Sequence, residues 1–145
     1  MAEVLYREVY PVERNSFDTA GEVSAKIKHT LKKMGVLPAI IREVAIASYE
    51  LELNLVIHSL GGTLTLEIAP DMLRLVSADR GPGIPDIPLA MTEGYSTASE
   101  AVRSMGFGAG MGLPNVKRHS HMFSIASEMD KGTEIEVGYH LTRAD

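Results

Sequence analysis

The sequence of 145 residues contains no cysteine, and it has few cations relative to its acidic residues. Without cysteine, structural disulfides and thiolate metal sites are excluded. The 14 lysines and arginines are outnumbered by 19 aspartates and glutamates, which gives a net charge of -5. A protein that binds a nucleic-acid backbone needs a basic face that releases counterions. Nucleic acid is therefore not an expected partner.

Long apolar runs are also missing from the sequence. No run approaches the roughly 20 residues that span a bilayer. The first residues lack the pattern of a basic segment followed by an apolar segment that marks a secretory signal. We therefore expect a cytoplasmic protein without a membrane partner. The length suits a single domain over residues 1–145, large enough to bury about two-thirds of its unfolded surface.

Hydrophobic periodicity predicts a mixture of helices and strands. Helical spacing covers residues 22–34, which Gly35 ends, and residues 39–58, which follow Pro38 and are apolar nearly all round. We expect strands over residues 4–10, 63–68, 72–78, 122–128 and 133–141, and a short helix over residues 113–121. Residues 84–112 are irregular apart from one short helix at 97–104, and a connection of that length is typical of a lid or binding loop.

Polar side chains interrupt the apolar helix at residues 39–58. Glu50 and Asn54 are four residues apart and share one helical face. Burying them would cost several kcal/mol unless partners satisfy them, which favours a functional role. A solvated stripe that includes Glu43 and His58 is the alternative. Glu52 points about 200° around the helix from Glu50, and we interpret it as solvated or as a partner contact.

Glycine is concentrated in two later segments. Asp79 follows an apolar strand and begins the sequence Asp-Arg-Gly-Pro-Gly, which on its own could be a surface turn. Further along, glycines at positions 106, 108, 110 and 112 precede a predicted helix. Such a loop allows close approach of the backbone, and its N–H groups and helix dipole favour phosphate. The spacing excludes the Rossmann and P-loop motifs, and a flexible linker is the alternative interpretation.

The remaining candidates are weaker on their own. The sequence Asp-Lys-Gly-Thr at residues 130–133 lies between two predicted strands and could be an ordinary hairpin turn. The five histidines have no metal-ligand spacing, so we interpret them as structural or solvent-facing. No metal site built from histidine is expected.

Together these segments resemble, in order and spacing, the four sequence boxes of the GHKL ATPases, the family of DNA gyrase, Hsp90, MutL and histidine-kinase catalytic domains. The segments are Glu-Leu-Glu-Leu-Asn from residue 50, Asp-Arg-Gly-Pro-Gly from residue 79, the glycine loop with Gly-Leu-Pro-Asn-Val-Lys-Arg from residue 112, and Gly-Thr at residue 132. The resemblance covers about residues 20–141 and extends to small bacterial anti-sigma factors and switch proteins that are serine/threonine kinases. It implies a Bergerat α/β sandwich, in which a mixed, mainly antiparallel sheet carries helices on one face and ATP lies between the helices and a lid.

The resemblance also implies roles for individual residues. Glu50 would be the general base, and the Asn54 side-chain oxygen would ligate Mg²⁺, a hard cation that takes oxygen ligands. Asp79 would accept the adenine amino proton and so discriminate against guanine. Thr133 would contact the adenine edge, often through water. Lys117 or Arg118 could reach the polyphosphate or lie on a solvated face. The implied nucleotide-binding residues are Asn54, Asp79, Gly81, Gly83, Gly106, Gly108, Gly110, Gly112, Leu113, Lys117 and Thr133.

The implied activity is that of an ATP- and Mg²⁺-dependent serine/threonine kinase acting on a STAS-type anti-sigma-antagonist protein. A sigma factor and a second copy of the chain are further partners that the resemblance leaves open. Two features depart from the family pattern: Tyr49 replaces a small residue, and His121 replaces an acidic one. The alternatives are a binding module that uses ATP as a switch, and a detached histidine-kinase catalytic domain. The latter is disfavoured because the sequence has no helical hairpin with a phosphoacceptor histidine.

Overall fold

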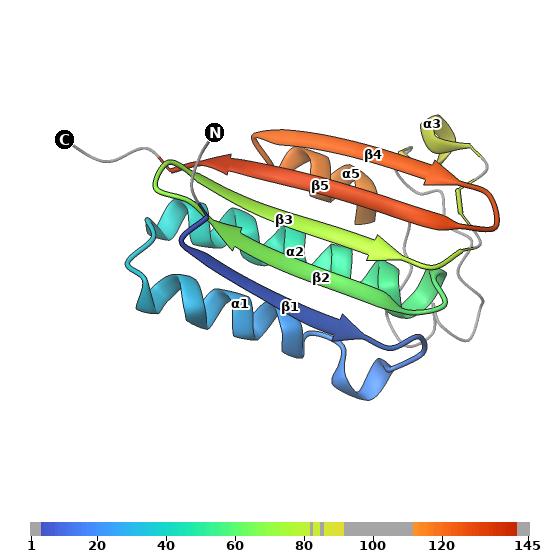
Figure 1. The fold of residues 1–145 in the computed structure, drawn as a ribbon, viewed down its shortest axis with the longest axis horizontal. Helices are drawn as coiled ribbons and strands as arrows, with labels where there is room; N and C mark the ends of the chain where they lie inside the picture. Colours follow the sequence, from blue (N-terminus) through green and yellow to red (C-terminus); the bar gives the residue numbers. More distant parts are fainter. Residues whose placement is uncertain (1–3, 82, 85, 92–111, 142–145) are drawn as a thin grey trace.

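The computed structural model describes residues 4–81, 83–84, 86–91 and 112–141, which form one sheet and a layer of helices. The sheet has five strands in the order β1-β2-β3-β5-β4, and each of its four pairings is antiparallel (Figure 1). The strands are β1 (Tyr6–Val12), β2 (Gly62–Ile68), β3 (Met72–Asp79), β4 (Met122–Glu128) and β5 (Gly132–His140).

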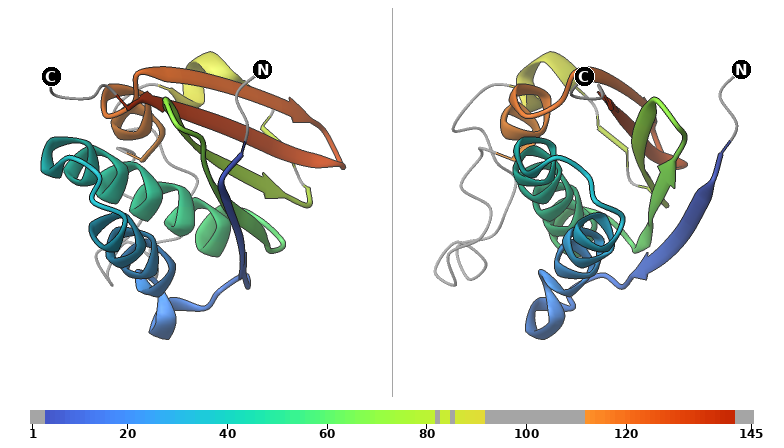
Figure 2. Two further views of the ribbon diagram at one scale, coloured as in Figure 1. Left: turned by 60° about the vertical axis from the view of Figure 1, so that its left-hand side comes forward. Right: turned by 90° about the vertical axis from the view of Figure 1, so that its left-hand side faces the viewer.

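Three helices cover one face of this sheet (Figure 2). They are α1 (Glu22–Lys33), α2 (Pro38–His58) and α5 (Gly112–Arg118), and two short helices, η1 (Phe17–Thr19) and α3 (Ile87–Ala90), lie in the connections. Among the residues described, no helix is both long enough and apolar enough to cross a membrane. The arrangement confirms the predicted two-layer sandwich.

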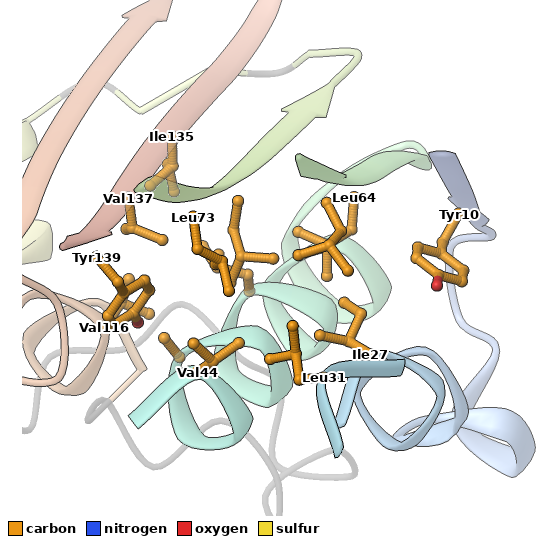
Figure 3. Packing of buried hydrophobic residues seen from close by; sticks show 14 of the residues in the cluster. Tyr10, Ile27, Leu31, Val44, Leu64, Leu73, Val116, Ile135, Val137 and Tyr139 are labelled. Carbon is orange, nitrogen blue, oxygen red and sulfur yellow. The ribbon is translucent and has the colours of Figure 1, made fainter. Parts of the chain in front are cut away.

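Helix α2 lies at the centre of the helical layer. It packs against α1 on one side, α5 on the other, and strands β1, β2 and β3 beneath it. Figure 3 shows the resulting core, in which Ile27 and Leu31 of α1 and Val44 of α2 lie beside Leu64 and Leu73 of the sheet. These side chains are fully buried. A helix enclosed in this way must be apolar nearly all round, which explains the sequence pattern of α2.

The opposite face of the sheet carries a row of charges across four strands. Arg7 pairs with Glu67 at 3.6 Å, and Arg74 pairs with Glu67 at 2.8 Å and with Glu136 at 3.1 Å. Exposed ion pairs contribute little to stability. Their position nevertheless identifies the solvent-facing side of β1, β2, β3 and β5, because these residues are neighbours in the strand register.

The boundaries of some elements differ from the sequence-based expectation. Strand β1 runs to Val12 because its pairing with β2 continues as far as Gly62. Helix α5 ends at Arg118, since the His121 N–H donates to the Gly138 carbonyl and so joins the sheet. The short helices η1 and α3 were not predicted. The helix expected at residues 97–104 lies outside the described residues.

The structure corrects the interpretation of Glu52. This carboxylate is only 2% exposed, and it accepts hydrogen bonds from the backbone N–H groups of Gly21 (3.0 Å), Val23 (3.2 Å) and Ser24 (3.0 Å). Gly21 is the N-cap residue of α1 and has no side chain with which to cap it. Glu52 therefore caps α1 from the neighbouring helix. The prediction that Glu52 is solvated or contacts a partner was wrong, because the face away from Glu50 meets the start of α1.

We expect Glu52→Ala to lower the free energy of unfolding by about 2–4 kcal/mol, because three N–H groups of α1 lose a buried, charged acceptor. Chemical denaturation followed by circular dichroism measures the change. Arg42→Ala is the control on the same helix, because Arg42 is exposed; its effect should stay within about 0.5 kcal/mol. A loss for Glu52→Ala no larger than that of the control would contradict the capping role.

Candidate functional site

Glu50 and Asn54 of α2 face the first residue of α5. A methyl group added to Gly112 would lie 3.1 Å from Glu50 Oε2 and 3.3 Å from Asn54 Oδ1. Glycine at this position therefore lets the start of α5 approach both polar side chains closely. The structure thus brings the polar pair of α2 together with the end of the glycine loop, although the two segments are far apart in the sequence.

The carboxyl group of Glu50 is partly removed from water. Burial raises the pKa of Glu50 above its ordinary value of 4.5. A carboxylate whose charged form is disfavoured by desolvation holds a proton more tightly than a solvated one. This property suits a group that accepts a proton from a hydroxyl during a reaction.

Asp79 ends strand β3 and points toward the neighbouring strand β5. Its Oδ1 accepts a hydrogen bond of 2.9 Å from the backbone N–H of Thr133. Burial raises the pKa of Asp79, and this hydrogen bond opposes the shift. Within the described part of the chain, Asp79 Oδ2 accepts no hydrogen bond, so it remains available to an N–H donor of a ligand.

Gly132 makes the contact between these two strands possible. Its φ of 142° belongs to a region that favours glycine, and a Cβ there would overlap the Asp79 carbonyl oxygen. The same Cβ would lie 3.1 Å from Asp79 Oδ1. Gly132 and Thr133 therefore lie directly against Asp79. The resemblance to the GHKL ATPases implied that these residues belong to the same site.

Ser127 joins the site without having been predicted. Its hydroxyl lies 2.8 Å from the Thr133 hydroxyl and accepts a hydrogen bond of 2.7 Å from the Ile84 N–H. Ser127 thereby links the segment after Asp79 to the Gly-Thr element. The available signal was its register position, since Ser127 of β4 pairs with Thr133 of β5.

Two glycines after Asp79 pack against the β4–β5 turn. The Gly81 N–H donates to the Lys131 carbonyl at 2.9 Å. Gly83 has a φ of 88°, and a Cβ there would lie 2.7 Å from the Glu128 carbonyl oxygen. Both glycines therefore serve a close approach between two backbone segments, and their contact with a base remains a prediction.

The other predicted nucleotide contacts are more dispersed. Leu113 is buried in the core cluster, whereas Lys117 is exposed in the last turn of α5. Lys117 is five residues beyond Gly112, or about 7–8 Å along the helix axis. Gly106, Gly108 and Gly110 lie outside the described residues, as does most of the predicted lid at residues 84–112.

Comparison with known proteins places this geometry in a family. Residues 41–143 match the family described as histidine kinase-, DNA gyrase B-, and HSP90-like ATPase. The chain belongs to this family. The matched region includes Glu50, Asn54, Asp79, Gly112 and Thr133.

Individual proteins resemble this chain to different extents. It is 33% identical over 114 residues to the serine/threonine-protein kinase RsbT of Bacillus subtilis (strain 168), an alignment that covers 76% of this chain and 80% of the relative. The RsbU and RsbW domains of Rv1364c from Mycobacterium tuberculosis share its fold with a TM-score of 0.65 and 17% identity. That match covers 95% of this chain and 32% of the other, so this chain spans about a third of that protein.

A second solved structure also shares the fold. The SiaB-SiaC complex from Pseudomonas aeruginosa contains a chain that matches with a TM-score of 0.62 and 14% identity. The match covers 94% of this chain and 89% of that chain. The fold likeness therefore extends beyond residues 41–143.

Burial of Glu50 predicts a pH-dependent effect on stability. Because the folded state raises the pKa of this carboxyl, it binds the proton more tightly than the unfolded state does. Stability from Glu50 is therefore greatest below pH 4.5 and decreases as the pH rises through the raised pKa. Glu50→Gln should raise Tm at neutral pH, because it removes a charge that burial disfavours.

The advantage of Glu50→Gln should disappear as the pH falls below 4.5, where the wild-type carboxyl is also neutral. Thermal unfolding across this pH range measures it. Glu134→Gln makes the same chemical change at an exposed position of β5 and should show no such pH dependence. A Glu50→Gln advantage that is constant with pH would contradict desolvation as the cause.

Proposed function

We propose that this protein is an ATP- and Mg²⁺-dependent serine/threonine kinase of the anti-sigma regulatory type, whose substrate is a STAS-type antagonist protein. The observation that carries the proposal is the position of Glu50 and Asn54 against Gly112. A base and an oxygen ligand lie together at the end of a glycine loop. The 33% identity to the serine/threonine-protein kinase RsbT supports phosphoryl transfer as the activity.

Each part of the site has a distinct task in this proposal. Asp79 binds the adenine amino group through its available Oδ2, while its Oδ1 stays on the Thr133 N–H. The carbonyl oxygen of Asn54 suits a Mg²⁺ ion, which would neutralise phosphate charge when bound. Gly112 leaves space beside Asn54 that any side chain would fill. The residues of the site therefore fit a magnesium nucleotide.

Glu50 acts on the protein substrate. It orients the acceptor serine hydroxyl and receives its proton as the serine oxygen bonds to the terminal phosphorus of ATP and the bond to ADP breaks. The raised pKa of Glu50 favours this acceptance. Catalysis of this kind depends mainly on positioning and electrostatic stabilisation. Lys117 is the candidate cation for the transferred group.

The proposal also covers the cellular location of the protein and its partner proteins. The protein acts as a single cytoplasmic ATP-binding domain over residues 1–145. The structural likeness to a chain of the SiaB-SiaC complex is compatible with a protein partner. A sigma factor and a second copy of this chain are further candidate partners.

Asp79→Asn should weaken ATP binding by about tenfold to a hundredfold, the equivalent of losing one hydrogen bond to a charged group. The asparagine Oδ1 can still accept from Thr133, so the fold should be retained, but its NH₂ group would face the adenine amino group. Calorimetry with ATP and GTP measures the affinities. Asp71→Asn, in an exposed turn, is the control. Equal ATP and GTP affinities in the wild type would contradict adenine recognition.

Glu50→Ala should reduce phosphoryl transfer by about a hundredfold or more, because the acceptor loses its base. ATP affinity should change little, since Glu50 acts on the acceptor. Labelled ATP is incubated with the protein and STAS proteins from the same genome, and phosphoserine is quantified by mass spectrometry. Glu134→Ala controls for loss of an exposed carboxylate. Transfer by Glu50→Ala at the wild-type rate would exclude Glu50 as the base, and ATP binding without any transfer would favour the switch alternative.

A further inference from the structure

Two hydroxyl groups, those of Ser127 and Thr133, lie against each other beside Asp79. Ser127 of β4 and Thr133 of β5 are partners in the strand register, and their hydroxyl oxygens are 2.8 Å apart. Strands β4 and β5 lie side by side at one edge of the sheet (Figure 1). The Thr133 N–H donates to Asp79 Oδ1 at 2.9 Å. The resemblance to the GHKL ATPases accounts for Asp79 and Thr133 but assigns no role to Ser127.

All three side chains lie on the face of the sheet that the helices cover. Asp79 is two residues beyond the buried Ser77 in β3, and Thr133 is two residues before the buried Ile135 in β5. Residues two apart in a strand share a face. Ser127 pairs with Thr133 and therefore lies on the same face. The three polar side chains thus form one row, on the side of the sheet where the proposed function places the base.

The Ser127 hydroxyl has three hydrogen-bonding neighbours. The Ile84 N–H donates to Ser127 Oγ at 2.7 Å. The Gly132 carbonyl oxygen lies 3.3 Å from Ser127 Oγ, and a carbonyl oxygen can only accept. The Thr133 hydroxyl, at 2.8 Å, can donate or accept. Because a hydroxyl group has one proton and two acceptor lone pairs, Ser127 can serve all three neighbours in only one arrangement.

That arrangement fixes the proton of the Thr133 hydroxyl. Ser127 donates to the Gly132 carbonyl and accepts from both the Ile84 N–H and the Thr133 O–H. If Ser127 donated to Thr133 instead, its bond to the Gly132 carbonyl would be lost, and one hydrogen bond fewer would form. Thr133 is only 7% exposed, so protein neighbours orient its hydroxyl more than water does. With its proton directed to Ser127, the Thr133 oxygen is left as an acceptor only.

We propose that Ser127 is a positioning residue for recognition of the base, because it holds the Thr133 proton so that Thr133 Oγ1 accepts from an exocyclic amino group. Asp79 Oδ2, which accepts no hydrogen bond within the described chain, is a second acceptor in the same row. Adenine carries an amino group where guanine carries a carbonyl group. Two acceptors without a donor favour the amino group and repel the carbonyl. The inference rests on the nucleotide-binding part of the proposed function and does not require phosphoryl transfer.

The test compares the affinities of the full-length protein for ATP and for ITP, whose base has a carbonyl group in place of the adenine amino group. Displacement of a ribose-labelled fluorescent ADP, with Mg²⁺ present, gives both Kd values for each variant. Ser127→Ala should raise the Kd of ATP about threefold to tenfold, the equivalent of about one hydrogen bond. The Kd of ITP should not rise, since the released Thr133 proton can donate to the carbonyl. An ITP-to-ATP ratio of Kd values that equals the wild-type ratio would overturn the proposal.

A double-mutant cycle with Thr133→Val shows whether Ser127 acts through Thr133. Valine keeps the branched shape of threonine but has no hydroxyl group. In the Thr133→Val background, Ser127→Ala should change the ratio of Kd values by less than about twofold, because the two substitutions remove the same interaction. An effect of equal size in both backgrounds would mean that Ser127 acts through Ile84 or through the fold, and the proposal would fail.

The matched control is Ser124→Ala, which removes an exposed hydroxyl group from the same strand. Its Kd values for both nucleotides should stay within about twofold of wild type. Ser127→Thr keeps the hydroxyl group on a β-branched side chain that suits a strand. It should retain the wild-type ratio, and a ratio as low as that of Ser127→Ala would contradict the role of the hydroxyl.

The outcomes separate this inference from the proposed function. If the wild type does not bind ATP, the proposed function fails, and this inference fails with it. If the wild type prefers ATP to ITP and Ser127→Ala keeps the full preference, only this inference fails. Circular dichroism checks the fold of each variant. If Ser127→Ala does not fold, Ser127→Cys replaces it with the same criterion, because a thiol is a weak hydrogen-bond partner.

Discussion

The buried carboxylate of Glu52 fixes the relative position of the helices on which the site depends. It lies two residues from both Glu50 and Asn54 on α2. Its side chain points toward α1 instead, where it accepts hydrogen bonds from three N–H groups at the start of that helix. A buried carboxylate is tolerated only with such partners. Because α2 is held to α1 by this cap, its other face can present Glu50 and Asn54 to Gly112 of α5.

Close backbone approach is the second constraint on the site. Gly112, Gly132 and Gly83 each lie where a Cβ would crowd or overlap another segment. These contacts bring α5 to α2, β5 to Asp79, and the segment after Asp79 to the β4–β5 turn. Crowding also removes Glu50 and Asp79 from water, and burial raises the pKa of both carboxyls. The same packing therefore determines the shape of the site and its electrostatics.

The sequence predicted those features that depend on local periodicity. The alternation in β2 and the apolar character of α2 located both elements. The glycines were predicted to contact a nucleotide, whereas the structure shows Gly83, Gly112 and Gly132 at close approaches between protein segments. The prediction for Glu52 failed because helical geometry gives the direction of a side chain but not what lies in that direction. Ser127 was missed for a similar reason. A single serine on an edge strand has no local signal, and its role appears only when β4 pairs with β5 in the observed register.

The part of the chain before residue 41 is built into the same fold as the region that matches the family. The family match begins at residue 41, after β1 and α1. Yet β1 pairs with β2 along its whole length, and α1 is capped by Glu52 from within the matched region. These interactions join the residues before 41 to the strands and helices that carry Glu50 and Asp79. The position of α2, and with it that of Glu50 and Asn54, therefore depends on contacts with residues that lie outside the family match.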